Sequence, residues 1–521
     1  MLNLKLKKNL FALIILALVT IAVVFRFLHL PLRPMHTDEA VHGIKFGQLL
    51  EDAVYQYDPI DYHGPTLNYL TLIPAFLRGQ QKITEVDEFT LRSVTAFTGL
   101  LLLLFLFWLR KIMSRNELII LFILFSIAPL LVFYSRYYIQ EILLVTFNFG
   151  FLVACSRYFI ERKVTWLITA AVFAGLTMAT KETWLLFFGL QALALIFTQL
   201  HSKKQKQAWS SFFQFFRSFH FFLAAFVIGL IYLLCYSSFF TYPQGIWNSV
   251  EAFAGYFQKA GNQAVHGQPW WYYGKVLIQP TKGYIPRADV WLFIGGITGA
   301  VLVLRSQASN SRQSFYQFLT YSTFLSLGLL SFFTYKTPWN ILVPYTGLIF
   351  LTGYTLQWLY ANLNLPLLII ISLLIAHLCW QTWQDNFVNY ANPDNTVVYS
   401  HPGKDLLDIS EKVHQVYDAW PSEKKFYLQV IYPEHDYWPL PWYLRALPNI
   451  SWQAAVDFDA PAAPFIISHL PNPDLTQQLY ELPPPGQRLL YMPLFEEPRQ
   501  LRPAAPVNVF LRKDLWDLVN R

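Results

Sequence analysis

Two adjacent carboxylates, Asp38 and Glu39, follow the first long apolar run of the chain by about ten residues. A carboxylate held near a hydroxyl group accepts its proton as the hydroxyl attacks, and a neighbouring acid or cation adjusts the pKa of that base. The sequence therefore predicts acid–base chemistry at a membrane surface, on a substrate partly dissolved in lipid. A structural alternative is that Asp38 caps the helix that follows. The flanking His36 and His42 favour catalysis, because capping does not require them.

A second pair of charged residues, Arg136 and Glu141, lies where one apolar run ends and the next begins. Arginine forms paired hydrogen bonds with phosphate oxygens, which suits a lipid phosphate arriving from the outer leaflet. The alternative for Arg136 is an internal ion pair with Glu141 that joins two helices. For Glu141 we expect a role beside Asp38, as a second acid or as a metal ligand.

Three further charged residues interrupt apolar stretches and are candidates for substrate binding: Lys181, Glu182 and Lys336. An ionised side chain in or beside the hydrocarbon layer needs a water-filled cavity or a partner. A lysine at a helix end also reaches the headgroups by extending its side chain, so a structural role is open for both lysines. Pro338 and Trp339 after Lys336 predict a turn with an aromatic wall, which favours phosphate binding there.

Metal binding is a separate question, for which Asp38, Glu39 and Glu141 are the first candidates. His63 stands in a His-Gly-Pro turn and is suited to contact a polar substrate group or a metal, although a lone histidine is more often a satisfied turn residue. His36 is placed to bind substrate or a metal. Because the spacing of these residues matches no strong zinc signature, a divalent metal ion stays open as a cofactor.

The composition excludes a soluble globular protein, because 55% of the 521 residues are hydrophobic and only 14% are charged. The net charge of +7 comes from Lys and Arg in short loops between apolar runs, which is typical of cytoplasmic loops and makes a nucleic-acid partner unnecessary. The three cysteines lie inside apolar runs and are expected to be packing residues.

The apolar runs predict an all-α polytopic membrane protein, since a spanning helix needs about 17 to 20 residues. We expect eleven spans, with the segment 64–79 as an interfacial helix and 38–54 as an amphipathic helix that has Thr37 or Asp38 near its cap. The expected spans are 10–28, 89–109, 118–134, 138–160, 164–180, 182–200, 218–240, 289–304, 315–335, 339–360 and 365–382.

A cytoplasmic N-terminus brings every strongly basic short loop to one side of the membrane. The residues that carry this argument are Arg110, Lys111, Arg115, Arg162, Lys163, Lys203, Lys204, Lys206, Arg305 and Arg312. The same threading places the loops 29–88 and 241–288 outside, together with the tail. All the candidate site residues then share one membrane face.

The composition changes near residue 386, where proline becomes frequent and membrane-length runs end. We therefore expect a transmembrane domain over 1–385 and a small extracytoplasmic α/β domain over 386–521. Strands are predicted at 426–432, 464–468 and 488–492, and helices at 404–418 and 473–481. Three aromatic residues of this domain, Trp438, Trp442 and Tyr443, either form its core or bind carbohydrate by ring stacking.

Five short motifs occur in an order that is similar to the GT-C glycosyltransferases, in particular the branch of protein O-mannosyltransferases and aminoarabinose transferases. More narrowly, the chain resembles a prokaryotic group of flippase-activity-associated membrane proteins, over nearly its whole length. The motifs are His36-Thr-Asp-Glu-Ala40, Tyr137-Tyr-Ile-Gln-Glu141, Thr180-Lys-Glu-Thr-Trp184, Lys336-Thr-Pro-Trp-Asn340 and Asp436-Tyr-Trp-Pro-Leu-Pro-Trp-Tyr-Leu-Arg445.

The resemblance implies an enzyme that transfers a hexosyl or pentosyl group from a polyprenyl-phosphate donor to an acceptor hydroxyl, with inversion, on the external face of the plasma membrane. It implies that Asp38 is the general base and that Glu39 and Glu141 support it or bind a metal. Arg136 and Lys336 match positions that hold the donor phosphate. Membrane lipid is the expected surrounding, and the acceptor is unassigned.

The alternative is a transport or assembly protein that moves a lipid-linked sugar without breaking bonds. Transporters usually carry charge near the bilayer midplane and are built from two repeated halves. Here the charges share one face and no internal repeat is visible in the sequence, which favours the enzyme.

Overall fold

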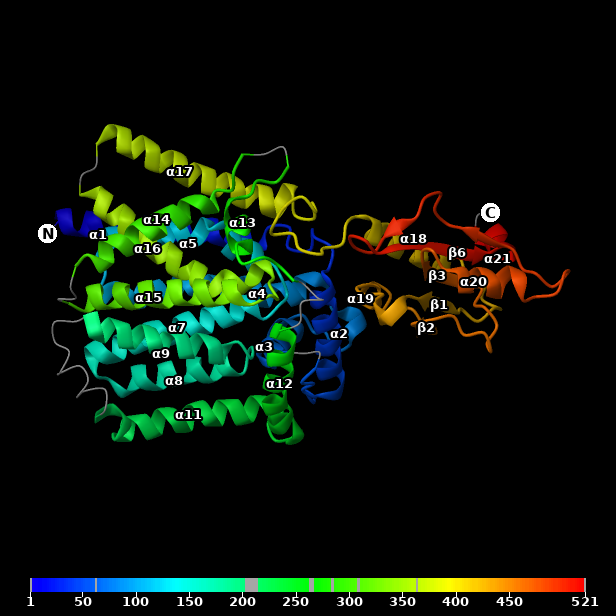
Figure 1. The fold of residues 1–521 in the computed structure, drawn as a ribbon, viewed down its shortest axis with the longest axis horizontal. Coiled ribbons are helices and arrows are strands. Elements are labelled where there is room, and N and C mark those ends of the chain that lie inside the picture. Colours follow the sequence, from blue (N-terminus) through cyan, green and yellow to red (C-terminus); the bar gives the residue numbers. More distant parts are fainter. Residues whose placement is uncertain are drawn as a thin grey trace.

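A bundle of long helices carries a small α/β unit at one end, as the ribbon of the computed structural model shows (Figure 1). The structure describes residues 2–60, 63–201, 214–261, 267–282, 285–306, 310–361 and 364–519, with the side chains of 2–8 and 256–260 left out. Asp61 and Tyr62, which precede His63, and the basic loop residues Lys203, Lys204 and Lys206 lie outside the described residues.

Each predicted span coincides with helical structure, and one of them is divided in two. The helices are α1 (Leu2–Phe27), α4 (Glu88–Leu106), α5 (Arg115–Ile127), α6 (Pro129–Ser135), α7 (Glu141–Glu161), α8 (Val164–Met178), α9 (Trp184–His201), α11 (Phe219–Tyr236), α14 (Asp289–Leu304), α15 (Ser311–Phe332), α16 (Leu342–Tyr360) and α17 (Leu365–Trp383). The predicted span 118–134 is bent by 54° between α5 and α6. Ala128, which precedes Pro129, has extended backbone angles, because a proline disfavours the helical conformation in the residue before it.

The chain is a multi-pass membrane protein. Among the described helices, six are long and apolar enough to cross a membrane, and the bent pair α5–α6 raises this number to seven. The helices α8 and α14 are apolar but shorter. Both still lie within the bundle, where α8 packs on α7 and α14 packs on α16.

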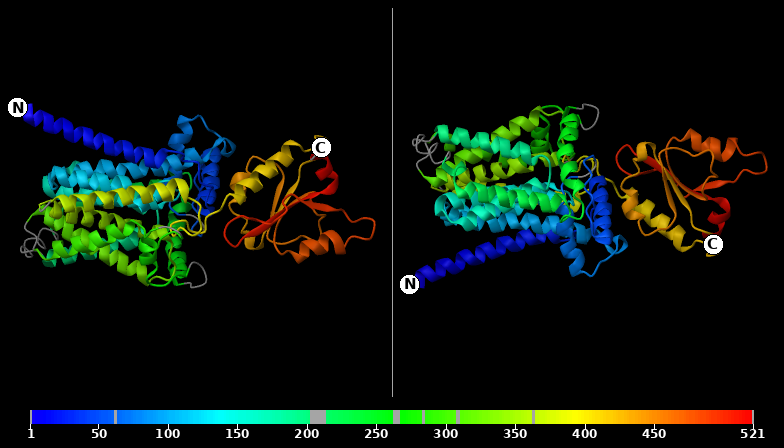
Figure 2. Two further views of the ribbon diagram at one scale, coloured as in Figure 1. Left: turned by 90° about the horizontal axis from the view of Figure 1, so that it is seen from above. Right: turned by 90° about the horizontal axis from the view of Figure 1, so that it is seen from below.

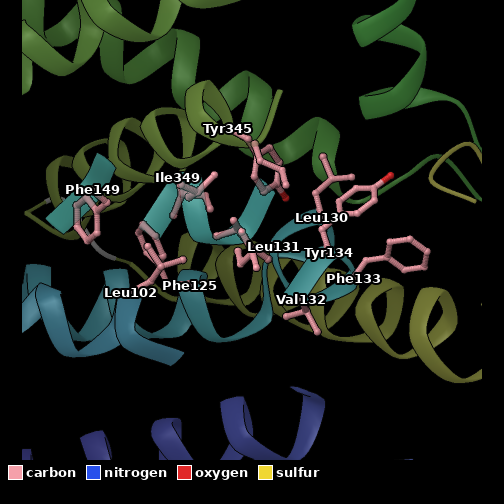
Figure 3. Close-up of a cluster of buried hydrophobic side chains, with 14 of the residues drawn as sticks. Leu102, Phe125, Leu130, Leu131, Val132, Phe133, Tyr134, Phe149, Tyr345 and Ile349 are labelled. Atoms are coloured by element: carbon pink, nitrogen blue, oxygen red, sulfur yellow. The ribbon is translucent and has the colours of Figure 1, made fainter. Parts of the chain in front are cut away.

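The short helix α6 lies in the centre of the bundle, and all of its residues are buried. Figure 3 shows Leu131 and Tyr134 of α6 among side chains of the surrounding helices, including Phe125, Phe149 and Tyr345. A helix that is apolar on every side is stable only inside such a core. This packing fixes the backbone at the start of the segment 136–141, which leads to the candidate site.

Four helices lie across the end of the bundle that faces the α/β unit (Figure 1): α2 (Thr37–Asp52), α3 (Thr66–Leu77), α12 (Gln244–Gly261) and α13 (Tyr272–Ile278). The predicted amphipathic and interfacial helices correspond to α2 and α3. Thr37 and Asp38 lie near the cap of α2 as predicted, but Asp38 does not cap the helix itself. His36 is the N-cap, because its Nδ1 accepts a hydrogen bond from the Asp38 amide, and Glu39 completes a capping box.

The C-terminal unit is built on one six-stranded sheet with the strand order β2-β1-β3-β6-β4, and β5 pairs with β6. The strand β1 is parallel to β2 and β3, whereas β6 is antiparallel to β3, β4 and β5. The strands are β1 (Leu428–Ile431), β2 (Ile450–Gln453), β3 (Phe465–His469), β4 (Tyr491–Pro493), β5 (Arg499–Gln500) and β6 (Pro506–Arg512). Figure 2 shows the sheet together with its helices α18 (Asp405–Asp418), α19 (Leu440–Tyr443), α20 (Pro473–Thr476) and α21 (Lys513–Val519).

The elements predicted for this unit are confirmed at β1, β3, β4, α18 and the helical segment that begins with α20. The strands β2, β5 and β6 were not predicted. In β6 the buried residues Val507, Val509 and Leu511 alternate with less buried ones, so a period of two was present in its sequence. The domain boundary predicted at 385–386 falls within η4 (Gln384–Val388), a π-helical turn after α17, and it stays a prediction.

The sheet unit is attached to α2 and α4 through α19 and the residues around it. The fully buried Trp442 packs against Gly43, where an added Cβ atom would lie 2.7 Å from Cζ3 of the indole. Its Nε1 donates to Glu88 at 2.9 Å, and Arg445 Nε donates to the carbonyl of Ile83 at 3.1 Å. The hydroxyl of Tyr443 accepts the Met35 amide at 2.8 Å. These contacts join the two parts of the molecule beside the N-terminus of α2.

Candidate active site

A cavity of about 470 Å³ lies at the end of the bundle where α2, the start of α7 and the turn before α9 converge. Most of the wall is contributed by residues that are far apart in the sequence. The lining residues are Asp38, Val41, His42, Pro59, Ile60, His63, Ile139, Gln140, Glu141, Lys181, Glu182, Ala252, Gly255, Leu330, Phe333, Tyr335, Trp339, Asn340 and Trp438.

Five of the nine predicted site residues line this cavity: Asp38, His63, Glu141, Lys181 and Glu182. The other four, His36, Glu39, Arg136 and Lys336, are not lining residues. All nine lie near the same end of the bundle, but the geometry divides them into a group that faces the cavity and a group that supports the backbone around it.

Asp38 occupies the first turn of α2, and 46% of its side chain is exposed. The positive end of the helix dipole stabilises a carboxylate at this position. Oδ2 of Asp38 lies 3.8 Å from Nδ1 of His36, which accepts the Asp38 amide, and within the described part of the chain no Lys or Arg side chain forms an ion pair with Asp38. Asp38 therefore has an accessible carboxylate whose oxygens are available to a substrate.

Glu39 has the opposite environment, because its side chain is fully buried and both oxygens are engaged. Arg92 donates to both oxygens at 2.8 Å, and the amides of Tyr138 and His36 donate at 2.8 and 3.0 Å. Burial by itself raises the pKa of Glu39, but Arg92 and Arg33 outweigh this effect and lower it to about 2. A direct catalytic contact, as predicted for Glu39, does not fit this burial, so Glu39 acts by fixing the start of α2.

Arg136 is also a supporting residue. Its guanidinium donates to the carbonyl oxygens of Phe25 (3.0 Å), Arg26 (3.3 Å), Leu28 (2.8 Å) and His29 (3.0 Å). Phe25 and Arg26 belong to the last turn of α1, where helical carbonyls lack a partner within the helix, and Leu28 and His29 follow directly, so Arg136 caps the C-terminus of α1. The predicted phosphate contact does not fit, because the hydrogen-bonding groups are turned to the backbone, and no pair with Glu141 is formed.

Glu141 pairs instead with Lys181, and both side chains are buried. Lys181 is the one Lys or Arg among the residues that line the cavity. It comes from the turn between α8 and α9, whereas Glu141 begins α7. The pair therefore places one positive and one negative charge next to Asp38 without a net charge of its own.

Glu182 is held by two partners from the loop before α3. Nδ1 of His63 lies 2.7 Å from its Oε2, and the hydroxyl of Tyr57 donates to its Oε1 at 2.9 Å. Burial by itself raises the pKa of Glu182. The nearby His63 and the hydrogen bonds outweigh this effect, so the pKa lies below its usual value and the carboxylate is ionised. The contact fixes the ring of His63 so that it borders the cavity. Gly64 is required here because a Cβ atom would overlap the carbonyl oxygen of Ala179.

Lys336 is buried, and its ammonium group donates to the carbonyls of Gln268 (3.0 Å) and Phe333. It fixes the turn before η3 (Pro338–Ile341) and is not a lining residue, so the predicted phosphate contact does not fit its position. The predicted aromatic wall is present, since Tyr335 and Trp339 line the cavity together with Asn340.

Two lining residues, Gln140 and Asn340, were not predicted as site residues, and two others, His42 and Trp438, were considered from the sequence without a firm assignment to the site. His42 follows Asp38 by four residues, so both lie on one face of α2, and this spacing was a usable signal. Burial, followed by the nearby His63, lowers the pKa of His42 to about 4. The ring is therefore neutral at neutral pH.

His401, a residue that the sequence did not single out, lies in the linker between η4 and α18 (residues 389–404) and packs beside His36. Its ring centroid lies 5.9 Å from that of His36 and 5.8 Å from that of Tyr137, and all three side chains are buried. Nδ1 of His401 faces the carbonyl of Pro402 at 2.8 Å and must donate to it, because a carbonyl oxygen only accepts. This contact fixes the tautomer of His401.

The residues first considered for a metal ion do not form a suitable donor set. Both oxygens of Glu39 are used by Arg92 and backbone amides, and Glu141 is paired with Lys181, which leaves Asp38 alone. Within the described ranges, no group of three or more His, Cys, Asp or Glu side chains is arranged to hold a metal. No step of the chemistry below is assigned to a metal.

Comparison with known proteins addresses the fold and the family of the chain. Residues 52–243 match the family of dolichyl-phosphate-mannose-protein mannosyltransferases (PMT). The structure is similar to ArnT from Cupriavidus metallidurans bound to undecaprenyl phosphate, with a TM-score of 0.65 and 13% identity over 96% of this chain and 98% of that one. No curated protein sequence matches the chain.

A second similar structure is the Archaeoglobus fulgidus oligosaccharyltransferase, with a TM-score of 0.53 and 13% identity over 89% of this chain and 70% of that one. The same archaeal protein in complex with Zn and sulfate has a TM-score of 0.50 at 12% identity, over 88% of this chain and 68% of that one. The predicted resemblance to the GT-C glycosyltransferases is confirmed for the fold and for the family match over 52–243. The narrower resemblance to the flippase-associated group stays a prediction.

Proposed function

Because the chain has the GT-C glycosyltransferase fold and a PMT-family segment, we propose that it is an inverting glycosyltransferase that uses a polyprenyl-phosphate-linked sugar. The observation that carries this proposal is the cavity in which the accessible carboxylate of Asp38 lies beside the paired charges of Glu141, Lys181 and Glu182. The fold alone indicates a class of protein, whereas the residues that line the cavity support a specific reaction.

Asp38 is the general base in this proposal. Of the three carboxylates that line the cavity, Glu141 is paired with Lys181 and Glu182 with His63 and Tyr57, so Asp38 is the one without a close cationic partner. A base must be within hydrogen-bonding reach of the proton it removes, and an accessible carboxylate in the cavity wall satisfies this requirement. Asp38 takes the proton of the acceptor hydroxyl while that oxygen attacks the anomeric carbon.

The bond that breaks joins the anomeric carbon to the phosphate oxygen, and its electron pair leaves with the polyprenyl phosphate. Lys181 is placed to stabilise this charge, because it is the one Lys or Arg among the lining residues. His63, whose ring is held by Glu182 through Nδ1, presents its other nitrogen as a second donor when that nitrogen carries a proton. One direct displacement inverts the anomeric carbon, and no enzyme nucleophile is required.

The lipid part of the donor suits the apolar side of the cavity. This side is formed by Ile60, Ala252, Gly255, Leu330 and Phe333, which come from the loop before α3, from α12 and from the end of α15. Ile60 is itself largely exposed, at 68% of its surface. An apolar surface with a few polar groups at one end is the usual form of a site for an amphiphilic ligand.

For the orientation, we propose that the cavity and the sheet unit face the outside of the plasma membrane. The connections from α4 to α5 and from α7 to α8 lie at the end of the bundle opposite to α2 and the sheet unit (Figure 1), and they contain Arg110, Lys111, Arg162 and Lys163. Short loops rich in Lys and Arg are typical of the cytoplasmic side. The donor would then be used after it has reached the outer leaflet.

The proposal is tested with the purified full chain in lipid nanodiscs and undecaprenyl-phosphate hexoses and pentoses that carry a label in the sugar. We expect an acceptor-dependent release of undecaprenyl phosphate and a product with inverted anomeric configuration. If reconstituted liposomes move the labelled lipid across the bilayer with no release of undecaprenyl phosphate, the enzyme proposal is wrong and the transport alternative is supported.

A further inference from the structure

The aromatic residues that follow Asp436 have two different positions in the structure. Trp442 and Tyr443 are attachment residues: Trp442 is fully buried and donates to Glu88 at the start of α4, and the hydroxyl of the partly buried Tyr443 accepts the Met35 amide before α2. Trp438 is only partly buried, and it lines the same cavity as Asp38. It packs with the hydrophobic core of the helix bundle, whereas most of the unit's own apolar residues form separate cores. One residue of the sheet unit therefore reaches the candidate active site.

The position of Trp438 is fixed from the side of the sheet unit. Nη1 of Arg502, from the loop between β5 and β6, donates to the carbonyl oxygen of Trp438 at 2.8 Å. The same guanidinium forms an ion pair with Asp436. Arg502 thus fixes the backbone at Trp438, and the indole itself packs against the core of the helix bundle.

We infer that Trp438, together with Trp339, forms a subsite for the acceptor and that this acceptor is a saccharide. The inference rests on the proposed function. The apolar side of the cavity, at α12 and the end of α15, suits the donor lipid, so the part contributed by the sheet unit is left for the molecule that arrives from water. The sheet unit lies beyond the end of the bundle, away from the helices that cross the membrane (Figure 1).

The chemistry of the neighbouring residues supports a saccharide. Indole rings pack against the C–H faces of sugar rings, and Trp339 and Trp438 are the two indoles in the lining. The uncharged side-chain amides of Gln140 and Asn340 line the same cavity. Each amide can donate a hydrogen bond to a sugar hydroxyl and accept one from it. A sugar hydroxyl placed by these groups would be next to Asp38, which removes its proton.

The test separates the binding of the acceptor from the binding of the donor. The full chain in nanodiscs is prepared as wild type, Trp438→Ala, Trp438→Phe and the control Trp516→Phe, which changes a tryptophan on α21 of the same unit. Binding of a panel of methyl hexosides and methyl pentosides is measured by saturation-transfer NMR. Binding of undecaprenyl phosphate is measured by thermal stabilisation, which also shows whether each variant is folded.

We expect Trp438→Ala to weaken the binding of at least one methyl glycoside by about five- to tenfold, in line with the ~1 kcal/mol of an aromatic contact. Trp438→Phe should weaken it less, and Trp516→Phe should have no effect. Undecaprenyl phosphate should bind all four proteins equally. The inference is wrong if glycoside binding is unchanged in Trp438→Ala, if the wild type binds a serine-containing peptide but no glycoside, or if undecaprenyl phosphate binding is lost instead.

The failure of the proposed function gives a different result. If wild-type protein releases no undecaprenyl phosphate from any donor, the enzymatic proposal fails, yet the glycoside measurement remains readable, because it requires no turnover. If release occurs and Trp438→Ala leaves the KM for the acceptor unchanged, the enzymatic proposal stands and the acceptor subsite is rejected.

Discussion

Two charged sites of the molecule differ in how completely their charges are paired. In the first, the fully buried Arg287 donates to Asp289 and Asp385 at 2.8 Å each. Tyr345 and Asn395 complete the hydrogen bonds of the two carboxylates, at 2.5 and 2.9 Å. In the second, the cavity, Asp38 is nearly half exposed and has one distant partner, His36.

The difference indicates which charges are structural. Burial of an ion costs several kcal/mol, and this cost is offset only when partners and hydrogen bonds saturate the charge. The Arg287 cluster satisfies this condition and joins α14, η4 and the linker that leads to His401. A charge that the fold leaves partly unsatisfied beside a cavity, such as Asp38, is available for a substrate.

The largest effect is expected for Asp38→Asn, which keeps the shape of the side chain and removes the base. We expect the rate of sugar transfer to fall by about 10²- to 10⁴-fold, the range for the loss of a general base. The midpoint of thermal unfolding should change little, because the carboxylate is accessible. Asp52→Asn, at the exposed end of the same helix, is the control and should keep the activity. An active Asp38→Asn protein would refute the assignment.

The opposite outcome is expected for Arg287→Met. This change leaves Asp289 and Asp385 buried without their cation, so the free energy of unfolding should fall by about 3 to 5 kcal/mol. The measurement is chemical unfolding of the protein in detergent. The control Arg499→Met, which breaks a surface contact with Asp405 at 3.7 Å, should cost less than about 1 kcal/mol. Equal effects of the two changes would remove the distinction drawn above.

The third prediction concerns pH. The pKa of His42 is lowered to about 4 in the folded protein, so between about pH 6.5 and 4 the unfolded state binds more protons at this residue. Stability should therefore fall as the pH falls through this window, by up to about 3 kcal/mol, and should be insensitive to His42 above it. Unfolding midpoints of wild type and His42→Gln at pH 7.5 and 4.5 test this sign. A wild-type curve with the same slope as the variant would contradict it.

The smallest effect is expected for Tyr134→Phe, which removes one neutral hydrogen bond next to the Arg287 cluster. The hydroxyl of Tyr134 donates to the carbonyl oxygen of Val397 at 2.9 Å, and both groups are buried. The loss should be about 1 to 2 kcal/mol in the free energy of unfolding. A loss as large as that of Arg287→Met would mean that the linker, more than the charge, carries the stability of this region.

Most helices could be predicted because a membrane span must be apolar over its whole length, and that requirement is visible in any window of the sequence. Short elements were harder. Thr37 or Asp38 was expected near the cap of α2, but the capping residue, His36, which accepts the Asp38 amide, was not identified. The break between α5 and α6 at Ala128 and Pro129 was missed, although proline marked it.

The site was predicted to the level of a shared membrane face. Threading brought Asp38, His63, Glu141, Lys181 and Glu182 together, and the structure places them around one cavity. The separation of Asp38 from Glu39 was not predicted, because it depends on Arg92, which is 53 residues away. An arginine inside the apolar run 89–109 was a signal that it needs a buried partner, but the partner could not be identified from the sequence.

The amino-acid order alone determined that the chain crosses a membrane many times, that acids and bases collect at one end, and that a small sheet unit follows. These properties depend on residue type and on spacing along one helix or loop. Only the tertiary structure decided which charged side chains face the cavity and which are bonded to the backbone. Arg136 at the end of α1 and Lys336 before η3 both donate to backbone carbonyl oxygens. The physical reason is that residues from distant segments either supply the ion-pair and hydrogen-bond partners of a charged side chain or do not, and no local sequence pattern contains that information.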